Sequence, residues 1–203
     1  MDITFESLPK KIQELAVKYR DRATKPNYRF LENMMIYAQY NRKDRDLKLT
    51  KDGLARCIQW SKEKGGPKMN VSGDVEGNQF RVQFEWSPHD KPIIRNEMKK
   101  HFGFPFNPSG LFLIPEDGGF FGWHTNADKT MPRVYIVWVE KPNSSWFYVS
   151  KDGKNIKTIN EPQGWSVNCF QPPDWHAAKS NCIRFSMGFR QMKGEPVWLD
   201  QEK

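Results

Sequence analysis

The chain has 203 residues, of which 37% are hydrophobic, 14% aromatic and 28% charged. This length suffices for one domain with a substantial core. The composition is too apolar and aromatic for a disordered protein, and too polar for a protein embedded in a membrane. We therefore expect a single domain over residues 1–203 that has no membrane partner.

The start of the chain and its cysteines bear on the cellular compartment. The first ten residues, MDITFESLPK, lack the basic region and apolar stretch of a secretion signal. Cys57, Cys169 and Cys182 are odd in number and far apart, which predicts neither a disulfide framework nor a cysteine zinc site. These features favour the cytoplasm.

The formal net charge of +8 is unevenly distributed. Residues 1–100 carry 21 Lys and Arg against 14 Asp and Glu. A basic surface attracts nucleic acid or acidic protein segments, although charges spread over exposed helix faces give the same count. The basic and aromatic residues that would form such a surface are Arg20, Arg22, Lys25, Tyr28, Arg29, Arg42, Lys43, Arg45, Lys48 and Lys51.

Residues 1–103 are predicted to be a basic, mainly helical support region. Apolar residues recur at helical spacing over 12–19, and further helices are predicted over 31–40 and 50–60, the last with Thr50 as its N-cap. Over residues 80–86 apolar and polar residues alternate, which predicts a half-buried strand. A short helix over 93–101 follows.

Residues 104–203 are predicted to form the core from short strands. Strand-like segments separated by Gly, Pro and Asn turn signals occupy 111–114, 120–125, 133–139, 146–150, 156–159, 165–170 and 183–190. Because no helix is predicted between them, they indicate an antiparallel sandwich or barrel. The fold class is therefore α+β, with the N-terminal helices buttressing one sheet of the barrel.

Two histidines in the strand-rich half are candidates for binding a metal ion. His124 and His176 each follow a tryptophan at the edge of a strand. Residues i and i+2 of a strand point to the same face, about 7 Å apart. His124 and the oxygen donor Asn126 can therefore converge on one ion, which a histidine from a remote strand completes. This is the pattern of a 2-His-1-carboxylate site, which leaves positions open for substrate and oxygen.

An arginine strand follows the second histidine. The segment RFSMGFR begins at Arg184, eight residues after His176, and on a strand Arg184 and Ser186 share one face. A guanidinium can clamp a carboxylate through two hydrogen bonds, and a neighbouring hydroxyl adds a third. A small dicarboxylate that chelates the metal with one end and reaches Arg184 with the other fits this layout.

Residues 110–190 resemble the Fe(II)- and 2-oxoglutarate-dependent dioxygenases, in particular their prolyl-hydroxylase-like branch. The family pattern is H-x-D, a distal histidine roughly fifty residues later, and an arginine on the next strand, often as R-x-S. Here HTN stands at 124–126, followed by His176 and by RFS at 184–186. The lead-in FLIPEDGGFFGWH is also similar. The resemblance implies a double-stranded β-helix of the jelly-roll or cupin type, Fe(II) as cofactor, and 2-oxoglutarate and dioxygen as cosubstrates.

By position, the resemblance implies roles for several residues. His124 and His176 would bind iron, while Arg184, assisted by Ser186, would hold the distal carboxylate of 2-oxoglutarate. Trp138 falls near the place where relatives direct a tyrosine hydroxyl at the cosubstrate, so its indole N–H could serve there. Packing in the core is the other interpretation of Trp138.

The third metal ligand is where the sequence departs from the family. Asn126 replaces the usual aspartate, and its neutral amide oxygen stabilises Fe(II) less than a carboxylate does. Three alternatives remain open: Asn126 or a water that it orients completes the site, Asp128 supplies the carboxylate, or the site is inactive. In the last case the chain would be a non-enzymatic β-helix binding module.

The resemblance thus implies an oxygenase, and the basic N-terminal region suggests an acidic protein segment or a nucleic acid as its substrate. Arg190 either faces the substrate entrance or is only solvated. The sequence contains no Walker loop, Rossmann fingerprint, G-x-S-x-G elbow or HExxH motif that would indicate a different chemistry.

Overall fold

The computed structural model describes residues 3–25, 36–39, 45–63, 79–115, 118–125, 132–171 and 174–192. The helices are α1 (Lys10–Thr24), α2 (Arg45–Lys48), α3 (Lys51–Glu63) and α4 (Asp90–Phe102). The strands are β1 (Ile36–Gln39), β2 (Gln79–Gln83), β3 (Phe106–Ile114), β4 (Phe120–His124), β5 (Arg133–Val139), β6 (Ser145–Ser150), β7 (Lys157–Asn160), β8 (Gly164–Phe170), β9 (Trp175–Ser180) and β10 (Arg184–Gln191).

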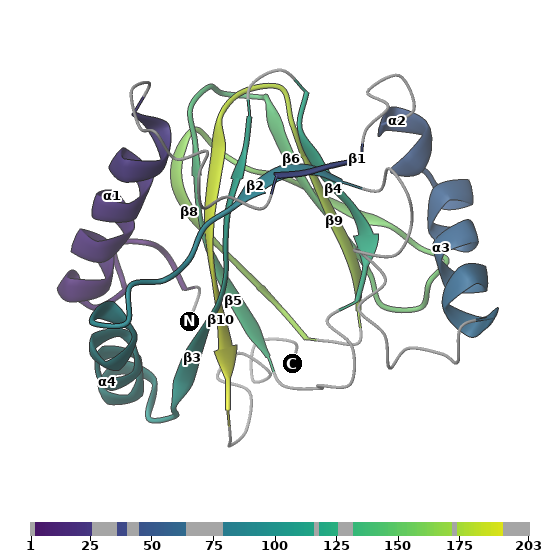
Figure 1. Cartoon of the computed structure of the whole chain (residues 1–203). Helices are drawn as coiled ribbons and strands as arrows, with labels where there is room; N and C mark the ends of the chain where they lie inside the picture. The colour runs from purple at the N-terminus through teal and green to yellow at the C-terminus, as the bar shows by residue number, and fades with distance from the viewer. Residues whose placement is uncertain are drawn as a thin grey trace.

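The strands form a sheet that folds into two facing halves (Figure 1). Its order is β7-β6-β9-β4-β2-β3-β10-β5-β8, with β1 paired to β2, and the paired strands are antiparallel. Strands β6, β9 and β4 form one half, and β3, β10, β5 and β8 form the other. Strand β2 pairs with both β3 and β4 and so joins them. The prediction of an antiparallel sheet combined with helices is confirmed.

Helices cover the outer faces of both halves (Figure 1). On one side α1 packs against β10 and against α4, and its buried face carries Ile12, Leu15, Ala16 and Tyr19. On the other side α3 lies beside β4, where Leu54 packs with Phe120 and Trp123. The sequence predicts helices that buttress one sheet of the barrel, whereas the structure places helices outside both halves of one continuous sheet. In the described part of the chain, no helix has the length and apolar character needed to cross a bilayer.

Several elements lie where the hydrophobic periodicity places them, and two do not. Thr50 caps α3, since its Oγ1 accepts a hydrogen bond from the Gly53 N–H at 3.2 Å. The helix predicted over 31–40 is wrong at Ile36–Gln39, which is strand β1, because these residues pair with β2; the rest of that range lies outside the described residues. Strand β9 was not predicted, because its sequence WHAAKS contains no β-branched residue.

Tyr19 links α1 to the start of α4. Its hydroxyl donates a hydrogen bond to Asp90 Oδ2 at 2.7 Å and accepts one from the Ser87 N–H at 2.9 Å, while Lys18 forms an ion pair with Asp90 at 3.0 Å. Burial, together with the Asp90 carboxylate, raises the pKa of Tyr19 to about 12. Burial opposes ionisation of Asp90, but the hydrogen bonds from Tyr19 and Lys18 outweigh it and lower the Asp90 pKa below 3.8.

We expect Tyr19→Phe to lower the free energy of unfolding by about 1.5–3 kcal/mol at pH 7, as for other hydrogen bonds to a charged group. Because the folded-state pKa of Asp90 is lowered, this contribution is present above pH 3.8 and is lost as the pH falls through the folded-state value. Urea unfolding at pH 7 and pH 3 measures it. Lys11→Ala, which removes an exposed ion pair with Glu14, is the control and should change little. A Tyr19→Phe effect that does not shrink at pH 3 would contradict the assignment.

Candidate active site

The pairing of β4 with β9 places two histidines directly opposite each other. His124 and His176 are cross-strand partners, next to a register shift that falls between Phe121 and His124. Their ring centroids are 4.0 Å apart, and the ring planes are inclined by 52°. The structure therefore brings together the two imidazoles that the sequence singled out, from positions roughly fifty residues apart.

Both imidazoles are held in the protonation state that a metal ligand needs. The Nδ1 atom of His124 lies 2.8 Å from the Gly122 carbonyl oxygen, and that of His176 lies 3.1 Å from the Asp174 carbonyl oxygen. A carbonyl can only accept, so each Nδ1 carries a proton and each Nε2 keeps a lone pair. Burial lowers the pKa of His176 to about 3 and lowers that of His124 well below 6.5, so both rings are neutral at pH 7.

Aromatic rings surround the histidine pair. Phe121 stacks on His124 with ring centroids 3.7 Å apart, and Phe170 lies 4.4 Å from His176. Phe147 and Tyr135 lie 6.1 and 6.3 Å from His176. A site walled in this way excludes water and strengthens electrostatic interactions inside it.

The histidines line a small cavity between the two halves of the sheet. Arg184 and Ser186 of β10 line the same cavity, as their shared strand face predicts. Arg81 of β2 also lines it. The Arg81 guanidinium carbon is 3.9 Å from the Phe112 ring centroid and 4.1 Å from that of Phe121. The cavity thus combines a histidine pair with two buried cations.

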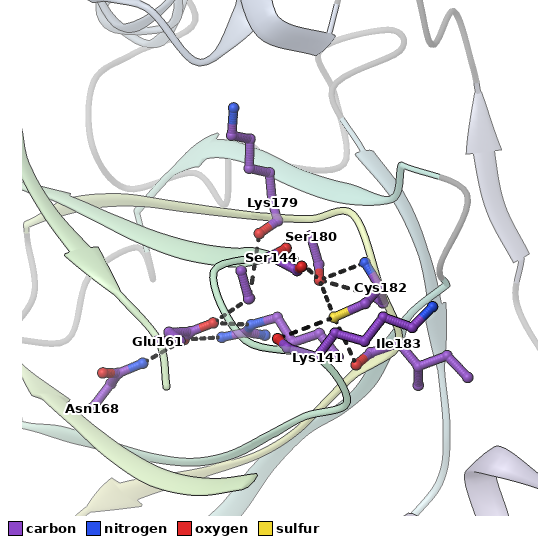
Figure 2. Close-up of polar contacts among 10 residues, drawn as sticks. Lys141, Ser144, Glu161, Asn168, Lys179, Ser180, Cys182 and Ile183 are labelled. Carbon is purple, nitrogen blue, oxygen red and sulfur yellow. Dashed lines mark hydrogen bonds and ion pairs between the residues drawn. The ribbon is translucent and has the colours of Figure 1, made fainter. Parts of the chain in front are cut away.

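Arg184 is bound by an internal carboxylate. Its Nε and Nη2 donate to the two oxygens of Glu161 at 2.6 and 2.7 Å, and both side chains are almost fully buried. Glu161 also accepts hydrogen bonds from Ser145 Oγ and Asn168 Nδ2, each at 2.6 Å. Figure 2 shows Glu161 at the centre of these contacts, with Asn168 beside it. The guanidinium expected to clamp a ligand is therefore already engaged on one edge.

The structure does not bring Trp138 to the cavity. On β5, Tyr135 faces the cavity, whereas Trp138 packs in the cluster beneath α1, with the Arg20 guanidinium carbon 5.1 Å from its ring centroid. Successive side chains of a strand point to opposite faces, so residues 135 and 138 cannot share one. The cosubstrate role expected for Trp138 is thereby corrected, and Tyr135 is the aromatic residue of β5 that lines the cavity.

Two of the predicted metal-ligand candidates lie outside the described residues. These are Asn126 and Asp128. Within residues 3–25, 36–39, 45–63, 79–115, 118–125, 132–171 and 174–192, no group of three His, Cys, Asp or Glu side chains is arranged to hold a metal. The described part of the site is thus a two-histidine centre.

In the basic N-terminal region some described cations are engaged within the chain, whereas Arg22, Lys25 and Lys51 are exposed. Arg20 pairs with Asp21 and lies over the rings of Trp138 and Trp165. Arg45 pairs with Asp46, and only 14% of its side chain is exposed. Tyr28, Arg29, Arg42 and Lys43 lie outside the described residues.

Three residues of the site escaped the sequence reasoning. Tyr135 could have been found from strand alternation, since it shares a face with Arg133 and Val137. Arg81 alternates with the apolar residues of β2 and so looked like a solvent-facing residue. Glu161 directly follows β7 and carries no motif, so no signal in the sequence pointed to its pairing with Arg184.

We expect the histidine pair to bind a divalent metal, tested with Co(II) as a spectroscopic substitute for Fe(II). Loss of a group that only hydrogen-bonds to a metal ligand typically lowers metal affinity about 10–100-fold. Loss of a ligand itself should cost more, so we expect His124→Ala and His176→Ala each to weaken Co(II) binding by about 100-fold or more. Calorimetry and visible absorption measure the affinity. His101→Ala is the matched control, because His101 is exposed on α4. Equal Co(II) binding by all three variants would rule out this centre.

The chain matches no protein-family model and no curated protein sequence. Among solved structures it is similar to a Pseudomonas putida prolyl-4-hydroxylase, with 15% identity, a TM-score of 0.41 and coverage of 89% of this chain and 99% of that one. A Trichoplax adhaerens prolyl hydroxylase, in complex with a hypoxia inducible factor peptide fragment, has 11% identity, a TM-score of 0.44 and coverage of 92% and 95%. A 2OG-Fe(II) oxygenase family protein from Burkholderia pseudomallei has 15% identity, a TM-score of 0.40 and coverage of 85% and 89%. These values are too low to assign the chain to a family.

Proposed function

We propose that this chain is an Fe(II)- and 2-oxoglutarate-dependent oxygenase built on a double-stranded β-helix. The observation that carries the proposal is the histidine pair: His124 and His176 are neutral, buried and adjacent, in the wall of a cavity that Arg184 and Ser186 also line. The order and spacing of these residues resemble the ligand and clamp pattern of that family.

The histidine pair fits an iron ion. The backbone carbonyls of Gly122 and Asp174 hold the two Nδ1 atoms, so the lone pair of each ring is on Nε2, the atom that would bind a metal. Two imidazoles supply two of the three protein ligands in the 2-His-1-carboxylate pattern. We propose that Asn126, a water that it orients, or Asp128 completes the set.

The side chains that line the cavity also suit an anionic cosubstrate, with one difference from the expected clamp. A guanidinium carries five N–H donors, and Arg184 uses two of them on Glu161. The remaining N–H groups of Arg184 can donate hydrogen bonds to a ligand. Ser186 and the positively charged Arg81 line the same cavity. We infer that the distal carboxylate of 2-oxoglutarate binds Arg184 together with Glu161. It does not occupy the edge formed by Nε and Nη2, which donates to Glu161.

When bound, Fe(II) and 2-oxoglutarate supply dioxygen activation coupled to oxidative decarboxylation, which leads to hydroxylation of a substrate C–H bond. The chain's own residues hold the ion, orient the dicarboxylate and keep water out. Phe121 and Phe170 cover the two imidazoles. Glu161 fixes the orientation of Arg184, whose side chain could otherwise adopt many rotamers.

A binding module without catalysis is the second candidate function, and Glu161 is the observation that favours it. The Arg184 charge is already neutralised by a carboxylate that Ser145 and Asn168 also hold. A guanidinium satisfied in this way needs no ligand, so the cavity would take up no 2-oxoglutarate.

Anaerobic addition of Fe(II) and 2-oxoglutarate distinguishes the two candidates. The oxygenase should develop a weak metal-to-ligand charge-transfer band in the visible range, and 2-oxoglutarate should raise its melting temperature. His124→Ala and His176→Ala should abolish the band, whereas His101→Ala, in the exposed histidine of α4, should retain it. Absence of both the band and the thermal shift in the unmodified protein would favour the binding module.

Glu161→Gln tests whether Glu161 competes with the cosubstrate. The substitution removes the negative charge from Arg184, so we expect 2-oxoglutarate to bind about tenfold more tightly, in line with one hydrogen bond to a charged group. The free energy of unfolding should fall, by up to about 3–5 kcal/mol, because a buried charge loses its partner. Titration of the charge-transfer band and urea unfolding measure the two effects. The matched variant is Glu140→Gln, which alters a partly exposed carboxylate outside the cavity lining and should leave the affinity unchanged. Weaker binding by Glu161→Gln would show that Glu161 supports the clamp and does not compete with it.

A further inference from the structure

We infer that Arg133 and Arg190 form a binding site for a carboxylate group of the substrate, beside the histidine pair. This inference rests on the proposed function, because it names the chemical group by which the substrate of that site is recognised. Arg133 begins β5 and Arg190 lies near the end of β10. We refer to the two residues as the arginine pair.

The strand register brings the arginine pair together. Arg133 is the cross-strand partner of Arg190 on β10 and of Phe170 on β8. Directly opposed residues of an antiparallel pair have Cβ atoms about 4.5–5.5 Å apart and project from the same face of the sheet. Both guanidinium side chains and the Phe170 ring therefore start from one patch of that face.

This patch adjoins the candidate metal centre. The Phe170 ring lies 4.4 Å from the His176 ring, centroid to centroid. Tyr135, two residues after Arg133 on the same strand face, lines the cavity. A group held by the arginine pair would thus lie one aromatic ring away from the histidines.

The arginine pair has unused binding capacity. Arg133 is only 6% exposed, and its Nε atom has no hydrogen-bond partner. Among the residues that the structure describes, neither guanidinium forms an ion pair with Asp or Glu, and Arg190 Nη2 contacts Met192 Sδ at 3.6 Å. Buried polar groups are normally satisfied, and like charges directly opposite each other destabilise a sheet. A bound anion would supply the missing hydrogen-bond partner and offset the repulsion between the two guanidinium groups.

The surroundings favour a carboxylate on a mainly apolar segment. Guanidinium groups match the planar geometry of a carboxylate through paired hydrogen bonds. The neighbouring side chains Phe170 and Tyr135 offer aromatic surface to the rest of such a segment. Nucleic acid binding instead requires a series of exposed cations, whereas Arg133 is only 6% exposed and the arginine pair lies beside aromatic rings. We therefore commit to an acidic peptide as the substrate class.

The test uses the metal-free protein, so that it does not depend on iron or 2-oxoglutarate. The ¹H–¹⁵N resonance of the Arg133 Nε–H group is followed by NMR during titration with acetyl-Ala-Asp-Ala-amide, with the neutral acetyl-Ala-Asn-Ala-amide, and with inorganic phosphate. We expect a saturable shift with the Asp peptide and none with the Asn peptide. Arg190→Gln should weaken Asp-peptide binding by about tenfold or more, the loss expected for hydrogen bonds to a charged group.

Two further variants complete the design. Arg133→Gln should abolish the binding of the Asp peptide, as measured by calorimetry. Because Arg133 is buried, this substitution could prevent folding, and in that case Arg190→Gln provides the test. Arg56→Gln, in an exposed residue of α3, is the matched control and should bind normally.

Equal binding of the Asp and Asn peptides, or binding of phosphate alone, would overturn the inference. Binding of the Asp peptide by a protein that forms no charge-transfer band with Fe(II) and 2-oxoglutarate would refute the oxygenase and leave the carboxylate site standing. A charge-transfer band without Asp-peptide binding would refute only the carboxylate site.

Discussion

The cross-strand pairing of His124 with His176 is the constraint on which the rest of the site depends. Side chains alternate between the faces of a strand, so a slip of one residue between β4 and β9 would direct one imidazole toward the wrong face. The neighbouring Trp123 marks that other face, since it packs with Leu54 and Cys57 of α3. The packing of α3 on β4 therefore helps to fix the register that makes the two histidines meet.

Charge around the cavity is the second constraint. Arg81, Arg133 and Arg184 are each less than a tenth exposed, and Glu161 is the carboxylate that the described structure places against one of them. Because both histidines are neutral, the described residues of this region carry an excess of positive charge in a poorly solvated environment. Isolated buried cations are costly, so such a region is stabilised by anions. The described residues thus favour an anionic ligand at the arginine pair even if Glu161 keeps 2-oxoglutarate out of the cavity.

Features that depend on local interactions could be predicted from the sequence, whereas features that depend on tertiary contacts could not. Arg184 and Ser186 could be placed on one face because strand alternation is local, and the same rule, applied to β5, would have separated Trp138 from Tyr135. The partnership of Arg184 with Glu161 could not be predicted, because it joins a strand to a residue between β7 and β8 through tertiary packing. Likewise, β1 is a strand because β2 pairs with it, against its own helical periodicity.

Strand β10 connects the two ends of the proposed site. Arg184, Ser186, Gly188 and Arg190 alternate with residues that pack under α1, so they share the inner face. At about 3.3 Å per residue, Arg184 and Arg190 are roughly 20 Å apart along the strand. Between them, a Cβ atom on Gly188 would lie 2.8 Å from Tyr135 Cε1, so the glycine leaves room for the ring that lines the cavity. One strand can therefore separate a cosubstrate end at Arg184 from a substrate end at Arg190, with the aromatic surface between them.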